Sequence, residues 1–263
     1  MQKLLLKENK DDNTPLDLTV KYNQINKMKA ILDECFKLGI QECVVMNENK
    51  YGKNVLHQAV IYDCNDETFT CLLNFVKSDT GKIENLLFKR DNDGHTPFNY
   101  AVLNGHVNKM KSILEESAKL GIQECVVMNE NKCGQNALHL SAMNICKDEA
   151  FKCLLKFIKS NTMKIEQMLL KRDNNGCTPF DYTVKNGQVN KMNSILEESA
   201  KLGIQEHIVM NENECGHNVL HHAANVNRND KTLTCLLNLI KSDTAIMVQI
   251  LSKRDDNGNT PFD

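Results

Sequence analysis

Apolar residues recur along the chain at the spacing of short amphipathic helices separated by polar turns. A first predicted helix carries its apolar side chains on one face, namely Phe98, Ala101 and Val102. A second predicted helix repeats them at i, i+3, i+4 and i+8, namely Met110, Ile113, Leu114 and Ala118. This period is typical of an α-helix. A third apolar cluster at residues 125–128 and a polar turn at residues 129–134 complete the pattern.

The whole pattern returns at a fixed interval of 82 residues. This interval separates the threonines Thr14, Thr96, Thr178 and Thr260, and also the asparagines Asn54, Asn136 and Asn218. We name the segment that begins at each threonine an A repeat and the segment that begins at each asparagine a B repeat. The predicted repeats span residues 14–53, 54–95, 96–135, 136–177, 178–217 and 218–259, with partial repeats at 1–13 and 260–263. Such self-similarity predicts one stacked array over residues 1–263.

The ends of the helices are marked by residues with specific capping chemistry. Thr96 is a suitable N-cap, Pro97 suits the first helical position, and Asn99 stands where a capping box needs its second polar group. Gly105 and Gly121 are expected to end the two helices in the left-handed conformation. In a B repeat we expect the second helix near residues 69–76, a loop at 78–81 and a further apolar cluster at 83–88.

Charged residues on the second helix form pairs of opposite sign four positions apart. The pairs are Asp33 with Lys37, Glu115 with Lys119, and Glu197 with Lys201. This order is favourable on an exposed helix face. We interpret these charges as a solvated surface rather than a binding patch.

The overall charge excludes several classes of partner. The formal net charge is −2, and no run of Lys or Arg occurs, which argues against nucleic acid or an anionic membrane as a partner. No stretch approaches the roughly 20 apolar residues of a membrane span, and residues 1–8 lack a signal-peptide core. We therefore expect a monomeric cytoplasmic protein with protein partners.

The 11 cysteines follow the repeat, as shown by the 82-residue spacing of Cys71, Cys153 and Cys235. Helix layers pack roughly 10 Å apart, so equivalent cysteines two layers apart are separated by about 20 Å. A disulfide requires Cα atoms within ~4.4–6.8 Å. The cysteines are therefore predicted to be free, buried thiols, which fits a reducing compartment.

The turn and helix motifs resemble the ankyrin repeat. In the A repeat the resemblance rests on residues 91–98, which read Asp-x-x-Gly-x-Thr-Pro-Phe, on Gly105 and on the pair Ile113 and Leu114. In the B repeat it rests on Asn54, Leu56, His57 and the pair Leu72 and Leu73. The resemblance implies an all-α solenoid of stacked helix pairs with β-turn or hairpin connections. The ankyrin unit has about 33 residues, so each repeat here has roughly seven to nine more, which we place in a short third helical segment.

Two alternatives accompany this interpretation. A HEAT or armadillo solenoid has a period of about 40–47 residues, closer to the repeat length, but does not need a recurring Gly-x-Thr-Pro turn. The near-identical copies rich in Lys, Asn and Ile also resemble ankyrin proteins of AT-rich intracellular bacteria and some protists. That resemblance implies an effector delivered to a host cytoplasm. Both cut ends of the pattern suggest a fragment of a longer array or a truncated gene product.

Histidines are the most evident candidates for chemistry. The resemblance implies that His57, His139 and His221 tie the first helix to neighbouring backbone, and they lie about 20 Å apart, too far to share a metal. We expect His221 to be structural and His222 to be at the surface. No metal-finger spacing, phosphate loop or nucleophile motif is present. The sequence predicts no enzyme activity, no catalytic residue, no cofactor and no metal.

Positions that differ between otherwise near-identical repeats are candidates for partner recognition. They occur at the turn tips, in the first helix and in the loop after it: Tyr51, Lys53, Gln58, Tyr62, His95, Gln135, Leu140, Met143, Ile145, Cys177, His217, His222 and Val226. In the ankyrin family these regions form a concave binding face, whereas drift at exposed positions would give the same pattern. We predict a non-catalytic protein-interaction scaffold. The alternatives are a targeting arm of a larger enzyme or toxin, and a structural spacer.

Overall fold

A computed structural model describes residues 1–79, 82–143, 148–160, 165–224, 230–240 and 244–263. These residues form 19 helices and no strand. The fold is an all-helical ankyrin-type solenoid, as predicted. Contacts divide the chain into unit 1, Met1–Lys132, and unit 2, Cys133–Asp263.

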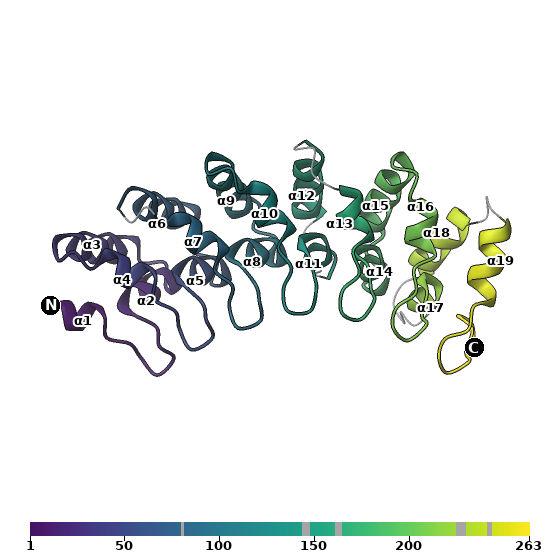
Figure 1. The fold of residues 1–263 in the computed structure, drawn as a ribbon, viewed down its shortest axis with the longest axis horizontal. Helices are drawn as coiled ribbons and strands as arrows, with labels where there is room; N and C mark the ends of the chain where they lie inside the picture. The colour runs from purple at the N-terminus through teal and green to yellow at the C-terminus, as the bar shows by residue number, and fades with distance from the viewer. Residues whose placement is uncertain (80–81, 144–147, 161–164, 225–229, 241–243) are drawn as a thin grey trace. The chain divides into compact units, whose positions relative to one another are not determined.

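Unit 1 contains three helix pairs, each followed by a short third helix. Its helices are α1 (Gln2–Leu5), α2 (Pro15–Lys21), α3 (Ile25–Lys37), α4 (Gln41–Val45), α5 (Val55–Ile61), α6 (Asp66–Asp79), α7 (Ile83–Phe88), α8 (Pro97–Asn104), α9 (Val107–Lys119) and α10 (Gln123–Met128). The first helices α2, α5 and α8 pack side by side, and α3, α6 and α9 form a second row behind them (Figure 1). The short helices α4, α7 and α10 confirm the predicted third segment. Helix α6 continues to Asp79, beyond its predicted end.

Unit 2 repeats the same arrangement. Its helices are α11 (Ala137–Met143), α12 (Asp148–Ser160), α13 (Ile165–Leu170), α14 (Pro179–Lys185), α15 (Val189–Lys201), α16 (Gln205–Val209), α17 (Val219–Ala224), α18 (Asp230–Ile240) and α19 (Thr244–Ser252). Helices α11, α14 and α17 pack in sequence, as do α12, α15 and α18. The first and second helices of unit 2 thus pack against their counterparts in the neighbouring repeats.

The predicted capping boxes are present. The backbone N–H of Asn99 donates to Thr96 Oγ1 at 3.2 Å, and the N–H of Thr96 donates to Asn99 Oδ1 at 2.9 Å. Asn54 and His57 make the equivalent exchange at the start of α5. Two otherwise unpaired donors are satisfied at each start, so the A and B repeats begin their helices by different chemistry with the same result.

Left-handed residues end the first helices. Gly105 has φ 69° after α8, as predicted. After α2 and α5 the same conformation is taken by Asn23 at φ 54° and Asp63 at φ 50°. Asn and Asp tolerate this region better than other residues with a Cβ atom. The Asn23 side chain also accepts the N–H of Asn65 at 3.1 Å, which anchors the loop to the next repeat.

The prediction of the apolar face of α9 is wrong for one residue. Met110, Ile113 and Leu114 are buried, but Ala118 is exposed and Ser117 is buried in its place. The Ser117 hydroxyl donates to the carbonyl of Ile113 at 2.7 Å. This local bond satisfies the hydroxyl inside the helix, so a polar residue occupies a core position that periodicity assigned to alanine.

The predicted charge pairs on the second helices are also shifted by one residue. Lys119 bonds to Glu116 rather than to Glu115, and Glu116 also lies 3.2 Å from Lys77 Nζ on α6. In unit 2, Glu198 likewise lies 2.7 Å from Lys201 Nζ and 2.8 Å from Lys159 Nζ. The carboxylate that pairs is therefore the one facing the neighbouring helix, because it serves both lysines.

The described cysteines are free thiols, but most of them are not buried. Cys35, Cys64 and Cys177 are buried, as predicted. Three thiols are partly exposed, namely Cys71, Cys153 and Cys235. Four others are exposed, namely Cys43, Cys125, Cys133 and Cys215. The prediction of burial is wrong for these two groups, because their side chains lie at the edge of a helix face or in a turn. Cys146 lies outside the described residues.

Candidate protein-binding surface

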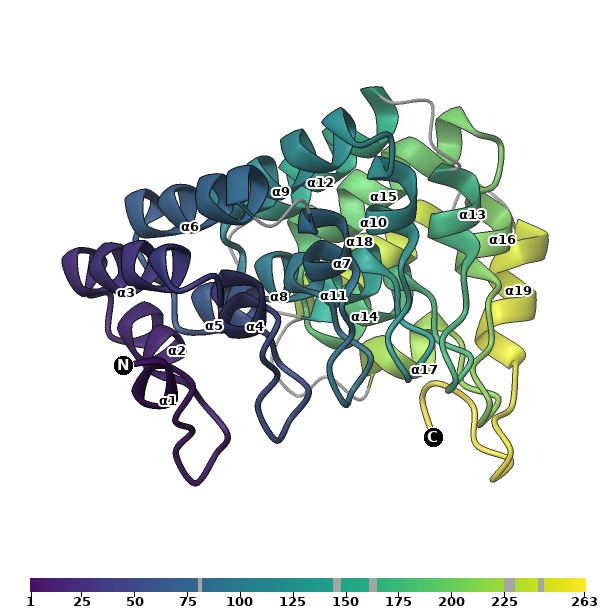
Figure 2. The same cartoon turned by 60° about the vertical axis from the view of Figure 1, so that its left-hand side comes forward.

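Polar turns project from one side of each unit and are joined by backbone hydrogen bonds (Figure 2). In unit 1 the N–H of Asn92 donates to the carbonyl of Tyr51 at 2.9 Å, and that of Lys132 donates to Asp93 at 3.0 Å. Gly94, at φ 82°, lies in this ladder, and a Cβ atom there would be 2.6 Å from the backbone nitrogen of Lys132. The turn therefore needs glycine both for its conformation and for the close approach of the next turn.

The three predicted structural histidines connect helix starts to the following turn. His57 Nδ1 lies 3.2 Å from the N–H of Asn54, and Nε2 lies 3.0 Å from the carbonyl oxygen of His95. A carbonyl only accepts, so Nε2 carries the proton. Burial lowers the pKa of His57 to about 4 and keeps the ring neutral. His139 and His221 make the same bonds in unit 2, which confirms the role implied by the resemblance.

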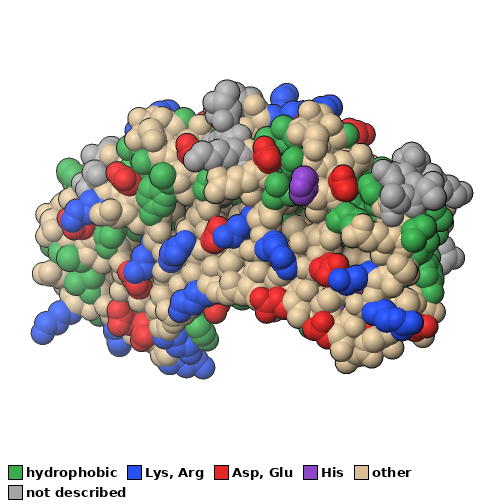
Figure 3. Space-filling view, turned by 45° about the vertical axis from the view of Figure 1, so that its right-hand side comes forward, with side chains coloured by type: hydrophobic (Ala, Val, Ile, Leu, Met, Phe, Trp, Pro, Cys, Tyr) green, Lys and Arg blue, Asp and Glu red, His purple; other side chains and the backbone are tan. Residues whose placement is uncertain are grey.

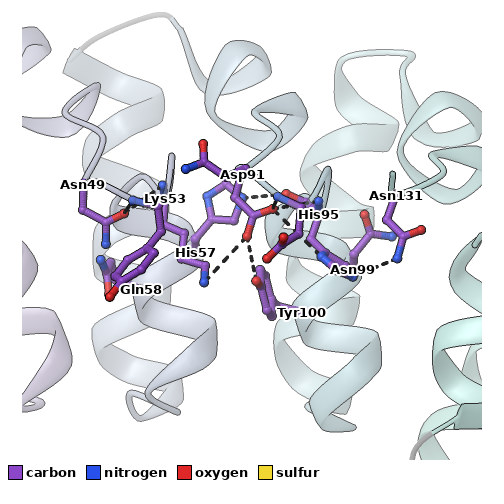
Figure 4. A network of polar contacts seen from close by, with 12 residues as sticks. Asn49, Lys53, His57, Gln58, Asp91, His95, Asn99, Tyr100 and Asn131 are labelled. Carbon is purple, nitrogen blue, oxygen red and sulfur yellow. Dashed lines mark hydrogen bonds and ion pairs between the residues drawn. The ribbon is translucent and has the colours of Figure 1, made fainter. Parts of the chain in front are cut away.

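Asp91 is the centre of the polar network between two turns of unit 1 (Figure 4). Its Oδ1 accepts the N–H groups of Asp93 at 3.0 Å and His95 at 2.9 Å. Its Oδ2 accepts the Tyr100 hydroxyl at 2.6 Å and lies 3.7 Å from Lys53 Nζ. Burial alone would raise the pKa of Asp91, but the hydrogen bonds from Tyr100 and from the turn hold it below its ordinary value.

The same turn contains the one group of possible metal ligands found among the described residues. Asp91, Asp93 and His95 offer ligand atoms within 4.8 Å of one another. Both oxygens of Asp91 already accept hydrogen bonds from its own turn and from Tyr100. These bonds account for the arrangement, and we assign the group to turn structure rather than to a metal.

Unit 2 builds the network with different side chains. Gln135 Nε2 lies 3.3 Å from Asp173 Oδ2 and 3.2 Å from the hydroxyl of Tyr182, which itself donates to Asp173 at 2.6 Å. At the next equivalent turn of unit 2, His217 Nε2 lies 3.2 Å from Asp255 Oδ2. These two candidate recognition positions therefore make internal contacts, as Lys53 does in unit 1.

Several candidate recognition residues are buried and contribute no surface to a partner. They are Gln58, Gln135, Leu140, Cys177 and His222. Gln58 donates to Asn13 Oδ1 of the preceding turn at 2.8 Å, and Leu140 is 1% exposed. We remove these five from the candidate surface. Ile145 and Val226 lie outside the described residues.

The placement of His222 corrects the expectation of a surface histidine. Its side chain is buried on α17, and burial lowers its pKa to about 3. The ring of His217 contacts it edge-on, with centroids 5.7 Å apart. His222 therefore packs as a neutral core residue.

The most exposed of the predicted residues are aromatic and lie in unit 1. Tyr51 is 49% exposed and Tyr62 is 44% exposed, whereas Lys53, His95, Met143 and His217 are partly exposed. Tyr22, which is 62% exposed, was not among the predicted residues. Tyr22 directly follows α2 as Tyr62 directly follows α5, and a comparison of A with B loops would have found it.

The charged side chains do not form a field of one sign. On the face shown in Figure 3, Lys and Arg alternate with Asp and Glu, and hydrophobic side chains occur in small groups between them. None of the described helices has the length and apolar character needed to cross a bilayer.

Comparisons with known proteins agree with this architecture. Residues 33–124 match the family model for ankyrin repeats (3 copies). The structure is similar to the crystal structure of the ankyrin repeat domain of Bcl-3, a unique member of the IkappaB protein family, with a TM-score of 0.61 and 17% sequence identity over 96% of this chain and 93% of that one. No curated protein matches the sequence.

Ankyrin repeats are generally protein-interaction modules, and their fold is a typical non-catalytic binding scaffold. Residues 33–124 thus match the ankyrin-repeat family by sequence, and 96% of the chain is similar in fold to an ankyrin repeat domain.

Proposed function

We propose that the chain is a non-catalytic scaffold that holds a protein partner on the face formed by its turns and first helices. The observation that carries this proposal is the exposure of Tyr51 and Tyr62 at positions that differ between repeats. Tyrosine is enriched in the buried cores of protein interfaces and among the residues that dominate binding energy.

The rest of the unit supports a rigid surface. The turns are linked by backbone hydrogen bonds, and Asp91 holds Lys53 and Tyr100 in place. A partner that docks on such a surface meets side chains that are already ordered, so little further entropy is lost on binding.

Site-specific photo-crosslinking tests this proposal. A benzophenone amino acid is placed at position 51 or 62 of the full chain, and at Lys111 on α9 as an exposed control. In lysate of the source cells we expect a discrete crosslinked protein from positions 51 and 62 that is absent from position 111. Equal crosslinking at all three positions, or none at 51 and 62, would overturn the proposed face.

A further inference from the structure

Lys21 lies between two exposed tyrosines at the ends of neighbouring first helices. Its Nζ is 4.6 Å from the ring centroid of Tyr62 and 5.7 Å from that of Tyr22. Tyr62 and Tyr22 are 44% and 62% exposed, and Lys21 is partly exposed, so all three residues contribute to the surface. We name these three residues the Lys21 cluster.

Lys21 differs from the other lysines nearby in its partners. Lys50 Nζ lies 2.6 Å from Asp11, and Lys109 Nζ lies 2.6 Å from Asp63. Among the described residues, no carboxylate forms an ion pair with Lys21 Nζ within 4.0 Å, although the Lys21 charge contributes to lowering the pKa of Asp11. The ammonium group thus interacts with unit 1 through ring contacts and a longer-range attraction to Asp11, without a directly bonded carboxylate.

The corresponding place in unit 2 has lost the cluster. Lys185 stands where Lys21 does, but its Nζ lies 3.0 Å from Cys177 Sγ, and Asn186 replaces Tyr22. The side chain of Asn186 donates to the carbonyl of Ala142 at 3.2 Å. Lys185 retains a single ring contact, with Tyr182 at 5.4 Å, so a lysine between two exposed tyrosine rings is a feature of unit 1 that repetition of the fold does not explain.

We propose that the Lys21 cluster binds an extended acidic segment of a partner protein, with a carboxylate on Lys21 and apolar residues against the two rings. The proposal rests on the function proposed above and names the chemistry of the partner. Charge complementarity selects the carboxylate, since an ammonium group over tyrosine rings attracts an anion while the rings offer apolar area and hydroxyl donors.

The spacing of the repeats sets the form of the segment. Packed helices lie roughly 8–10 Å apart, and an extended chain advances about 3.3 Å per residue. Two apolar residues three positions apart therefore reach both rings, with acidic residues between them. A segment of the form Pro-Glu-Glu-Pro meets these requirements, because proline favours the extended conformation and loses little entropy on binding.

A direct titration tests the charge requirement. A fluorescein-labelled peptide Gly-Pro-Glu-Glu-Pro-Gly and its counterpart with Gln for both Glu residues are titrated with the full chain, and binding is followed by fluorescence anisotropy. We expect the Glu peptide to bind about fivefold more tightly than the Gln peptide, with the difference lost at about 1 M salt. Equal binding of the two peptides would overturn the proposal.

Two lysine variants locate the site. Lys21→Gln removes the charge but keeps the side-chain length, and Lys29→Gln makes the same change on the exposed surface of α3. We expect the first to abolish the preference for the Glu peptide and the second to leave it unchanged. A preference that survives Lys21→Gln, in a variant with an unchanged circular dichroism spectrum, would show that the anion binds elsewhere.

The outcomes separate this inference from the proposed function. Crosslinking at positions 51 and 62 together with equal binding of the two peptides would retain the scaffold and reject the acidic partner. Selective peptide binding without crosslinking would retain the Lys21 cluster and reject the proposed partner complex.

Discussion

Units 1 and 2 use different side chains for the same contact between consecutive turns. In unit 1, Lys53 Nζ lies 3.7 Å from Asp91 Oδ2, and in unit 2 the equivalent Gln135 lies 3.3 Å from Asp173. An ammonium group and an amide both donate to a carboxylate. Sequence variation between repeats therefore does not by itself indicate recognition, because an internal acceptor can be satisfied by several donors.

A second difference lies at the start of the A helices. Asn99 in unit 1 and Asp181 in unit 2 are both buried and both accept the backbone N–H of their N-cap threonine, at 2.9 and 2.7 Å. Only Asp181 can ionise, and burial raises its pKa to about 6. Asp17 in unit 1 is buried at the equivalent position of α2 and also has its pKa raised by burial to about 6, so the difference lies between the repeats that begin at Thr96 and Thr178, which give a matched pair for experiment.

The largest expected effect comes from a residue that the units share. His57→Ala and His139→Ala each remove a buried ring and leave the carbonyl of the next turn, on His95 or Cys177, without its donor. We expect each change to lower the free energy of unfolding by about 3 kcal/mol. Urea unfolding followed by circular dichroism measures the loss.

Amide hydrogen exchange shows which unit is destabilised by each histidine substitution. Increased exchange confined to unit 1 for His57→Ala and to unit 2 for His139→Ala is the expected pattern. A loss below about 1 kcal/mol in one unit only would show that the two units do not depend equally on this contact.

Exchanging the buried carboxyl gives the next largest effect, and its size depends on pH. The pKa of folded Asp181, about 6, lies above its ordinary value of 3.8, so ionisation disfavours the folded state. The cost is absent below about pH 4 and complete above about pH 6. Asp181→Asn should therefore stabilise unit 2 by up to about 3 kcal/mol at pH 8 and by little at pH 4.

Asn99→Asp is the matched reverse change and should destabilise unit 1 over the same pH range. Among the described residues, Asn99 Nδ2 and Asp181 Oδ1 both lack a hydrogen-bond partner, so the two exchanges differ mainly in charge. Unfolding curves at pH 4 and pH 8 give the comparison. A stabilisation by Asp181→Asn that is equal at both pH values would contradict the assignment to ionisation.

Local chemistry explains how much of the fold the sequence could predict. Thr96 with Asn99, Gly105 and the short third helices are confirmed, because caps and helical periods are encoded within a few residues. The structural role of His57 is also confirmed, through its resemblance to a known motif.

The candidate surface was less predictable for a physical reason. Whether Gln58 is exposed depends on its bond to Asn13, which lies 45 residues earlier, and no local pattern contains that information. Leu140 is likewise only 1% exposed, although it occupies the position equivalent to Gln58 at which repeats differ. Comparing repeats identifies where side chains differ, but only packing between repeats decides which of them reach solvent.

A moderate effect is expected from the tyrosine that each network shares. Tyr100→Phe and Tyr182→Phe remove a hydroxyl that donates to Asp91 or Asp173 at 2.6 Å. We expect each change to cost about 1 kcal/mol. Thermal unfolding monitored by circular dichroism measures it, with Tyr51→Phe, whose side chain is exposed, as the control.

The smallest effect tests whether the differing residues of the two networks are interchangeable. Lys53→Gln gives unit 1 the donor of unit 2, and Gln135→Lys gives unit 2 the donor of unit 1. Each new side chain can reach the same carboxylate, so the free energy of unfolding should change by less than about 0.5 kcal/mol.

The charge of lysine makes a second readout possible, because the contribution of lysine to stability should fall with added salt and that of glutamine should not. Urea unfolding at about 0.05 M and 0.5 M salt compares them, on either side of the ionic strength at which screening becomes strong. A loss above about 1 kcal/mol from either exchange would mean that each unit requires its own donor, and the variation at this position would then reflect internal fit rather than tolerance.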